Sequence, residues 1–481
     1  MTSHMNESHP ADDTRPRTQR PTAIRWACLF LFSLALILFN PVAGLISQSA
    51  DDTDAKVPDP AKVTSPMLEM QARYAVGVEQ LLNQPITEGP LAPTPERYMK
   101  MAGESQIDRA RAVMLIARLF SKDDALEQLD RFRAEYRDSD RNLDETIAED
   151  LRIFEGILTG QNATKDERQR LINHHHLFGR LAVAQIEDDP QAQELRARIA
   201  DSAKTLAIAV FAFGASVLAL VGLGVVLLII LAVLFANGIF KPTFGRELRR
   251  TPSHEFNRVM TETAALFMGV FFLFKLVTTI AGDAIPQVAQ LAGQFALAAL
   301  ILWPVVRIGS LKKSAALMGW SRGEGIAREL GAGLFAYIAG LPILALGMIV
   351  ALVLITIFGV MPSHPVTESL PSGGVLEIVL LYALACVWAP IVEESVFRGA
   401  FYRAMRVEIP GFAGIALASL TTSFVFAAIH PQGIFFVPPL MALAIVFAFM
   451  REWRGSLIAP MFTHALHNAA VVTFSLILFG I

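Results

Sequence analysis

The sequence predicts an all-α protein: a multi-spanning transmembrane helical bundle of about nine spans, with a small all-α extramembrane domain inserted near its N-terminal end. Three observations predict this class. Of the 481 residues, 53% are hydrophobic, and the mean hydropathy of +0.46 exceeds what a soluble domain of this length needs. The apolar residues form long runs. One segment between the first two runs is instead polar and strongly charged.

Charge and cysteine content exclude two other classes. The net charge of -3 and the lack of a basic stripe interleaved with aromatic residues argue against a nucleic-acid partner. The two cysteines, Cys28 and Cys386, both lie inside apolar runs, so the chain has no disulfide scaffold. The partner that composition does predict is a lipid bilayer.

The N-terminal region predicts a tail followed by a membrane anchor. Residues 1–22 are polar, with scattered arginines, and we expect a disordered cytoplasmic tail. The anchor, residues 24–48, contains an apolar run from Trp26 to Ile46 that is long enough to cross about 30 Å of hydrocarbon. The run exceeds a typical signal-peptide core, which favours a retained anchor, although Pro41 and Ala43 leave cleavage open.

Residues 50–204 predict an acidic helical domain. The segment from 51 to 204 holds 29 of the 44 acids and 21 of the 41 bases. Stretches such as SPMLEMQARYAVGVEQLL and LDETIAEDLRIFEGIL place apolar residues at three- and four-residue spacing, which is typical of amphipathic helices. We expect the last helix of this domain to run directly into the next span. Substrate recognition, sensing and oligomerisation all remain open as its role.

The rest of the chain predicts transmembrane helices at 205–330 and a C-terminal core at 331–481. Its apolar runs are Leu206–Ala236, Met260–Ile280, Val288–Val306, Leu330–Val360, Val375–Val392, Phe412–Ile429, Phe435–Phe449 and Leu457–Phe479. Lysines and arginines concentrate in alternate loops, which the positive-inside rule assigns to the cytoplasm. The sequence therefore predicts a multi-pass integral membrane protein, which would lie in the cell membrane if the host is a prokaryote, with a cytoplasmic N-terminus and residues 50–204 outside.

Ionisable groups cluster at the predicted inner end of the sixth span, in APIVEESVFRGAFYRAMR. A charged residue at mid-membrane costs about 2.5–3.5 kcal/mol on insertion scales, so such a cluster needs an explanation. Arg398 lies four residues after Glu394 and can pair with it on one helix face. This pairing would leave Glu393 to face a cavity, where a carboxylate suits general acid–base work.

Two further spans contribute polar side chains. His430 closes the seventh span, and Pro431 prevents the helix from continuing unperturbed. His464 and Asn468 are one turn apart in the last span and share a face, whereas His467 points elsewhere. Read along the chain, Glu393 lies toward the inner side and His430 toward the outer side. For these groups to meet, the spans must be tilted, staggered or broken.

The motifs EESVFR, FAAIH and HALHN resemble the three blocks EExxxR, FxxxH and HxxxN of the CPBP family of intramembrane proteases. This family includes CAAX-protease-like and bacteriocin-processing proteins. The flanks FRGAFYRAM and REWRGSLIAPMFTHAL are also similar. The resemblance covers residues 330–481, leaves open an extension back to 255, and identifies the C-terminal core as CPBP-like. Each block is short, but three in order within about 75 residues make a specific signal.

The resemblance implies an intramembrane endopeptidase that cleaves a protein or peptide in or at the membrane. It implies that Glu393 is the general base that activates a water and that His430 helps to polarise the water or the scissile carbonyl. His464 and Asn468 would complete the site and stabilise the oxyanion. Glu394 and Arg398 would form a supporting pair. Two histidines and a carboxylate are also chemically adequate for a divalent metal such as zinc, and the sequence leaves metal dependence open.

Other interpretations of the same residues stay open. The bundle could belong to a non-proteolytic membrane scaffold, an immunity protein or a transporter-like component, although a transporter predicts internal repeats that the sequence lacks. The Glu393, Glu394 and Arg398 cluster could be a structural ion pair. His174, His175 and His176 suggest a metal site, but consecutive residues spread around a helix, which favours a solvated surface. We expect Glu262 and Lys275 to pair or to reach toward the membrane surface.

Overall fold

The computed structural model describes residues 20–51, 59–62, 65–88, 92–138, 142–239, 244–245, 254–281, 284–358, 374–409 and 411–479. Within these ranges the chain is helical and contains no β-strand, which confirms the predicted all-α class. Most of the predicted cytoplasmic tail falls outside the described residues. So do Lys241, Arg246, Arg249 and Arg250, on which part of the orientation prediction depends.

A small helical domain precedes the bundle, as the amphipathic patterns predict. Its helices are α2 (Pro66–Leu82), α3 (Pro95–Ala102), α4 (Gln106–Leu119), α5 (Lys122–Asp138), α6 (Glu145–Leu158), α7 (Lys165–His175) and α8 (Leu177–Val183), preceded by the short turn η1 (Pro60–Lys62). The core centres on α4, whose residues Val113, Met114 and Ile116 are fully buried. Polar residues fix the helix starts: the Asp144 side chain accepts hydrogen bonds from two backbone amides at the start of α6.

The helix α9 (Pro190–Ala236) joins the domain to the membrane in one piece, which confirms the predicted continuity. It begins at the N-cap Asp189, with Pro190 in the first turn, where proline is tolerated. Its first part packs against α2 and α8. A Cβ atom on Gly77 of α2 would lie 2.1 Å from the Ala203 carbonyl oxygen, so only glycine permits this close crossing.

Among the described residues, eight helices are long and apolar enough to cross a membrane, and each overlaps one of the predicted runs over most of its length. Besides α9 they are built from α11 (His254–Ala281), α12 (Gln287–Ala296) with η3 (Leu297–Leu302) and α13 (Trp303–Ile308), α15 (Ile326–Phe358), a segmented helix at Val375–Glu408, α20 (Gly411–Ala428), η6 (Ile434–Phe436) with α21 (Val437–Arg454), and α22 (Ile458–Phe479). The predicted ninth span is α1 (Arg20–Asp51), whose described apolar part is the shorter Ala23–Phe39.

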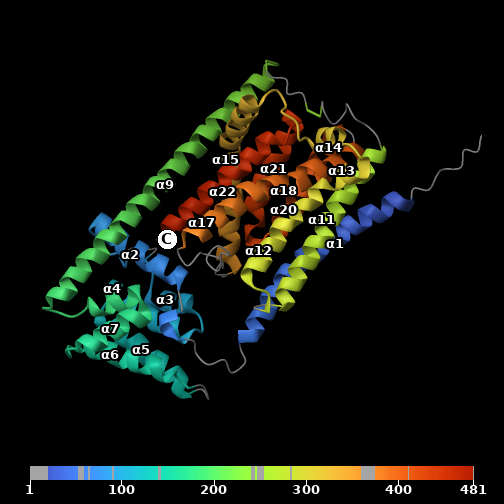
Figure 1. Cartoon of the computed structure of the whole chain (residues 1–481). Helices are drawn as coiled ribbons and strands as arrows, with labels where there is room; N and C mark the ends of the chain where they lie inside the picture. Colours follow the sequence, from blue (N-terminus) through green and yellow to red (C-terminus); the bar gives the residue numbers. More distant parts are fainter. Residues whose placement is uncertain are drawn as a thin grey trace, which may run out of the picture.

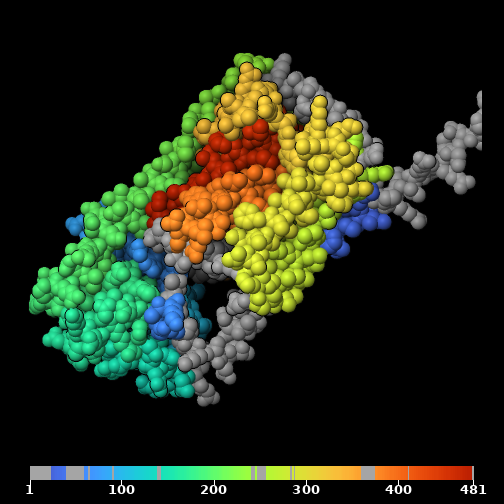
Figure 2. Space-filling view, in the orientation of Figure 1, coloured from blue at the N-terminus to red at the C-terminus, as the bar shows by residue number. Residues whose placement is uncertain are grey.

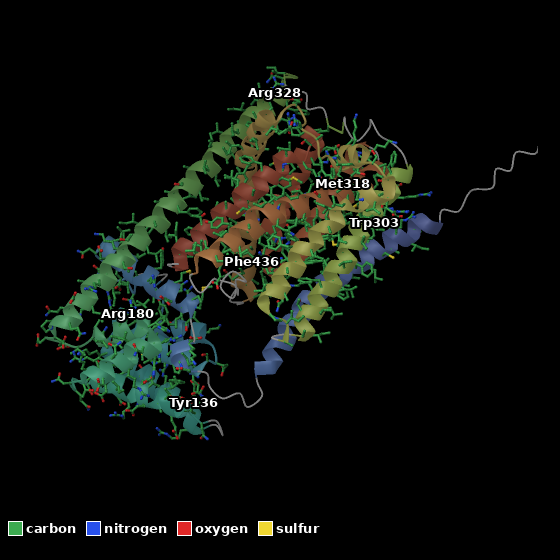
Figure 3. All side chains as sticks on the ribbon, in the orientation of Figure 1. Tyr136, Arg180, Trp303, Met318, Arg328 and Phe436 are labelled. Carbon is green, nitrogen blue, oxygen red and sulfur yellow. The ribbon has the colours of Figure 1, made fainter. Side chains whose placement is uncertain are left out.

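The spans pack into one bundle with the helical domain at one end (Figure 1). In Figure 2 the C-terminal helices, in orange and red, occupy the middle of the visible face, between α9 in green and the yellow helices α11 to α13. The short helix α14 (Leu311–Met318) lies at the end away from the domain. Figure 3 places Arg328, Met318 and Trp303 toward that end, whereas Tyr136 and Arg180 belong to the domain.

The segmented helix carries the predicted ionisable cluster. Its pieces are α17 (Val375–Tyr382), η4 (Ala383–Trp388), α18 (Ala389–Glu394), η5 (Ser395–Phe401) and α19 (Tyr402–Glu408), and both η4 and η5 are π-helical turns. The sequence placed the glutamates at the inner end of their span, which was wrong, because the helix continues to Glu408. π-Helical turns occur frequently at functional sites.

This extension removes the conflict between the heights of Glu393 and His430. Glu393 lies about 22 Å from the end of its helix at Glu408, at 1.5 Å per residue. His430 follows α20, whose 18 residues span about 27 Å from the same connection. The two helices are antiparallel and both extend to the same side of this turn, so the two side chains reach nearly the same depth.

Candidate active site

Three helices bring the predicted site residues together. Glu393 and Glu394 belong to α18, His430 follows α20, and His464 lies in the second turn of α22. The Glu393 Oε2 atom lies 3.8 Å from the Nε2 atom of His430 and 3.8 Å from the Nε2 atom of His464. Residues separated by 71 positions in the sequence therefore share one point inside the bundle.

Glu394 is fully buried and has two cationic or proton-donating neighbours. Its Oε1 atom accepts hydrogen bonds from Arg398 Nη1 at 3.0 Å and from His464 Nδ1 at 3.0 Å. A buried carboxylate without such partners would cost several kcal/mol, so Arg398 makes the position of Glu394 tolerable. The predicted pairing of the two residues is present.

Arg398 is itself held in a cage of aromatic rings and one carbonyl group. Its Nη2 atom donates to the Ala444 carbonyl oxygen at 3.0 Å. Its guanidinium carbon lies 4.7 Å from the ring centre of Phe426 and 5.1 Å from that of Phe447. Cation–π contacts strengthen when water is excluded, and Arg398 is only 1% exposed. The cage connects η5 to α20 and α21.

Hydrogen bonds on the Nδ1 atoms set the orientation of both histidines. His430 Nδ1 lies 2.5 Å from the Phe426 carbonyl oxygen, which can only accept, so Nδ1 carries a proton. His464 Nδ1 likewise faces the Glu394 carboxylate. When neutral, each ring therefore presents an unprotonated Nε2 atom toward Glu393.

Glu393 Oε2 is buried and accepts no hydrogen bond from the described residues. The distances of 3.8 Å to the two Nε2 atoms are too long for direct hydrogen bonds. Three atoms with lone pairs thus converge on one point, which favours a proton-donating or positively charged group between them. Polar atoms more than about 3.5 Å apart can be connected through a water molecule, and a water between these atoms would need a small outward shift of the side chains.

The same atoms fit a zinc ion less well. The ligands of a tetrahedral zinc, about 2.0–2.1 Å from the metal, lie about 3.3–3.4 Å from one another, closer than Glu393 lies to either histidine. Within the part of the chain that the structure describes, no group of three or more histidine, cysteine or acidic side chains is arranged to hold a metal ion. We therefore derive no catalytic step through a metal.

Asn468 lies one turn beyond His464 and contacts the π-helical turn η4. Its Nδ2 atom donates to the Ala385 carbonyl oxygen at 2.7 Å. A π-helical turn leaves a carbonyl group without its usual helical donor, and Asn468 supplies one. One of its two amide hydrogens is used in this bond, and the other remains to contact a ligand.

No motif in the sequence pointed to Tyr337, which lies on α15 and contacts a histidine of α22. The Tyr337 hydroxyl lies 3.0 Å from Nδ1 of His467, the histidine that points away from His464. A tyrosine in an apolar span is normally a packing residue or an interfacial residue, and only the packing of α15 against α22 brings it to this histidine.

The triple histidine of the helical domain is not a solvated surface, contrary to the sequence prediction. His175 is fully buried, and His174 Nδ1 and His175 Nε2 lie 2.7 and 3.1 Å from Asp150 Oδ2. Burial lowers the pKa of His175, against the opposing effect of Asp150. Burial alone would raise the pKa of Asp150, but hydrogen bonds from His175, Arg170 and His174 outweigh it and lower that pKa. The cluster stabilises the contact between α6 and α7.

Glu262 and Lys275, the two charged residues predicted in the third span, both lie in α11 but have different surroundings. Glu262 pairs with Arg25 of α1 at 2.8 Å and with Arg307 of α13 at 3.0 Å, as the sequence predicted. Lys275 is half-buried in α11, six residues before the helix ends at Ala281. The Glu262 pairs connect three helices at one end of the bundle.

Residues 375–470 match the family model described as Type II CAAX prenyl endopeptidase Rce1-like. The chain thus carries an Rce1-like domain, which is consistent with the CPBP resemblance found in the three motifs and confirms it. The matched segment is narrower than the predicted 330–481 and contains every predicted site residue. Neither the curated proteins nor the solved structures yield a match to the chain.

Proposed function

Starting from an Rce1-like domain of a protease family at residues 375–470, we propose that this protein is an intramembrane endopeptidase that uses a glutamate-activated water. One observation carries the proposal: Glu393 Oε2 lies 3.8 Å from the Nε2 atoms of both His430 and His464, inside the bundle. Ionisable groups at this depth are costly, and their convergence on one point is typical of a functional site.

In the proposed first step, a water molecule donates one hydrogen bond to Glu393 Oε2 and another to His430 Nε2. As the water oxygen attacks the scissile carbonyl carbon, Glu393 takes the proton as general base. The new carbon–oxygen bond gives a tetrahedral intermediate with one negative oxygen. Glu393 then passes its proton to the leaving amine as the carbon–nitrogen bond breaks, and the products are a carboxylic acid and an amine.

The negative oxygen of the intermediate needs a hydrogen-bond donor, and we assign this role to His464. Glu393, Glu394 and Arg398 together leave one net negative charge, which a proton on His464 would neutralise. Glu394 accepts from Nδ1 of this ring, so a proton on Nε2 would point toward the substrate oxygen. The free amide hydrogen of Asn468 is the second candidate donor.

Glu394 and Arg398 position the site without contacting the reacting atoms. Glu394 fixes the ring of His464, and the aromatic cage fixes Arg398. Asn468 also holds the π-helical turn η4, which precedes Glu393 in the same helix. This arrangement limits the motion of the reacting groups, as a catalytic site requires.

The proposed substrate is a protein or peptide in or at the membrane that reaches the bundle laterally or from the cytoplasmic side. The family description names CAAX prenyl endopeptidases, so a prenylated CAAX peptide is the first probe to use. An unbiased comparison of membrane-associated peptides in cells carrying the wild-type or the Glu393→Gln protein would identify other substrates.

The decisive test is peptide cleavage by purified variants. We expect Glu393→Gln and His430→Ala each to lower the cleavage rate by about 10²–10⁴-fold, the typical contribution of a general acid–base group. The control is Gln290→Ala on α12, a half-buried polar residue of the bundle whose side chain bonds to the Ile285 carbonyl oxygen, away from the site. Thermal unfolding in detergent shows whether each variant remains folded.

Unchanged cleavage by folded Glu393→Gln protein would refute the assignment. If the wild-type protein retains a membrane partner but never cleaves it, the rival non-proteolytic scaffold is favoured. A chelator such as phenanthroline should leave the rate unchanged, because the proposed mechanism uses no metal. Loss of activity that added zinc restores would replace the water mechanism with a metal mechanism.

A further inference from the structure

A pocket of about 400 Å³ lies where the helical domain meets the start of α9. Helices α2, α8 and α9 each contribute part of its lining. Ligand pockets commonly have volumes of about 300–1,000 Å³, so the space suits a small ligand or the head of a larger one. It is far from Glu393 and plays no part in the proposed hydrolysis.

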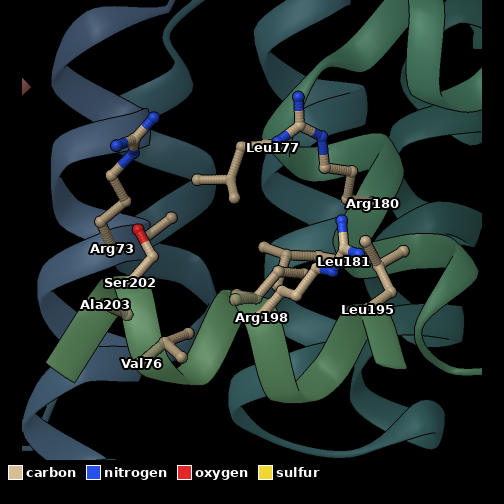
Figure 4. A pocket seen from close by; sticks show the side chains of 11 residues that line it. Arg73, Val76, Leu177, Arg180, Leu181, Leu195, Arg198, Ser202 and Ala203 are labelled. Atoms are coloured by element: carbon tan, nitrogen blue, oxygen red, sulfur yellow. The ribbon is translucent and has the colours of Figure 1, made fainter. Parts of the chain in front are cut away.

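The lining combines arginine side chains with an apolar floor. Arg73, Arg180 and Arg198 come from three different helices, and no acidic residue lines the pocket. Figure 4 shows Arg73 on one side and Arg180 and Arg198 on the other, with Leu177 between them. Leu181 and the remaining apolar side chains complete the floor.

The three arginines are not equally neutralised. Arg73 pairs with Glu69 and Arg198 pairs with Glu194, each one turn away on its own helix. Arg180 is exposed and forms no ion pair with any residue that the structure describes. A guanidinium group beside apolar side chains and without a carboxylate partner favours an anionic ligand, particularly a phosphate, which it binds in a bidentate manner.

The position of the pocket indicates that this ligand is a membrane lipid. Ser202 and Ala203 line the pocket, and the apolar run of α9 begins three residues later at Leu206. At 1.5 Å per residue, this part of the pocket lies within about 5–6 Å of the apolar run. Lipid headgroups occupy a layer of about this thickness on each side of the hydrocarbon.

The face of α9 that lines the pocket continues into the membrane. Leu195, Ile199 and Ser202 repeat at three- and four-residue spacing, and beyond Leu206, which is buried, the same side of the helix continues with Phe213, Val217 and Leu220. These last three side chains are 37%, 38% and 41% exposed, so lipid chains can reach them. A lipid whose acyl chains lie along this face would place its headgroup between the arginines.

We propose that this pocket binds the headgroup of an anionic phospholipid whose acyl chains lie along the exposed face of α9. The lipid would connect the helical domain to the bilayer surface and stabilise the domain close to it. Electrostatic attraction and the apolar floor act together, since a glycerophosphate group has both a charged and an apolar side. The proposal does not depend on proteolysis.

The test uses full-length protein in detergent and a fluorescent short-chain phosphatidylglycerol, with binding measured by anisotropy. Unlabelled phosphatidylglycerol should compete well, and phosphatidylcholine should compete poorly. We expect Arg180→Gln to weaken binding about tenfold or more, because it removes charge-assisted hydrogen bonds. Ser202→Trp should weaken binding by filling the pocket without changing a charge.

Arg131→Gln is the matched control. Arg131 is exposed in the same domain, like Arg180, but it pairs with Glu127 and Glu96 and does not line the pocket, so its replacement makes the same change of charge elsewhere on the domain. This variant should bind like wild type. Hydrogen–deuterium exchange of α8 in nanodiscs of phosphatidylcholine, with and without phosphatidylglycerol, should show protection that Arg180→Gln abolishes.

Four results would overturn the proposal. Equal binding of the two lipids by wild-type protein would remove the role of charge. Equal loss in Arg131→Gln and Arg180→Gln would indicate a nonspecific surface effect. Displacement by glycerol phosphate as effective as by the intact lipid would indicate a soluble organic phosphate, and displacement by an acidic peptide alone would indicate a protein ligand. None of these results would bear on the proposed protease activity, which is tested separately by peptide cleavage.

Discussion

At the scale of single residues, two buried clusters are built from the same kinds of side chain. In each, a fully buried carboxylate has a histidine and an arginine as partners: Glu394 with His464 and Arg398, and Asp150 with His175 and Arg170. A buried charge is tolerated only when it is paired and hydrogen-bonded. The first cluster positions the proposed active site, and the second connects two helices of the helical domain.

The second cluster predicts how the stability of the helical domain depends on pH. Because the folded-state pKa of His175 lies below its unfolded value of about 6.5, the unfolded state binds more protons than the folded state once the pH falls below this value. Its Nδ1 atom is buried without an acceptor among the described residues, so a proton there would lack a partner. The stabilisation is present above about pH 6.5 and is lost below it. A further loss from Asp150 follows below about pH 4.

Hydrogen exchange measures this effect in the full-length protein. After correction for intrinsic exchange rates, the amides of α6 and α7 should open more readily at pH 5.5 than at pH 7.5. His175→Gln should be less stable at neutral pH but should lack this dependence. The same dependence in the variant would show that another group titrates.

At the scale of helices, glycines determine how closely α15 packs against α21 and α22. Gly333, Gly340 and Gly347 recur every seven residues and are buried. A Cβ atom on Gly347 would lie 2.8 Å from the Pro438 carbonyl oxygen and 2.8 Å from Pro439 Cα. Small residues permit such close approach where no hydrophobic effect drives helices together. This contact supports α21, which also supplies part of the Arg398 cage.

Gly347→Leu should therefore destabilise the bundle by about 1–3 kcal/mol through overpacking. It should also lower the cleavage rate, because the added side chain displaces α21, and α21 supplies part of the cage that holds Arg398. The control is Gly331→Leu in the same helix, since a Cβ atom there would meet nothing within 4 Å. Thermal unfolding in detergent and the peptide assay check both variants. Equal unfolding temperatures for the two would contradict the close-packing argument.

At the scale of the whole molecule, the helical domain and the basic short helix α14 lie toward opposite ends of the bundle (Figures 1 and 3). From this arrangement the positive-inside rule predicts that α14 lies in the cytoplasm and the helical domain outside. The pocket between α2, α8 and α9 would then face the outer leaflet. The proposed active site lies between the two ends, within the segmented helix.

Labelling of single cysteines tests this orientation. In a background with Cys28 and Cys386 replaced by serine, Asp123→Cys in the domain should react with a membrane-impermeant maleimide on intact cells. Lys312→Cys on α14 should react only after the membrane is permeabilised. Both side chains are exposed, so accessibility depends on the side of the membrane. The reverse pattern would invert the topology and leave the proposed chemistry unchanged.

The sequence by itself determined the helical class, the positions of eight apolar runs and the three motifs, because hydropathy and motif spacing are local properties of the chain. It also predicted the Glu394–Arg398 pair, which lies within one helical turn. Only the tertiary structure decided that Glu393, His430 and His464 converge, because this depends on how far one helix extends and how three helices pack. For the same reason it decided the burial of His175, the contact of Asn468 with η4, and the pocket between three helices.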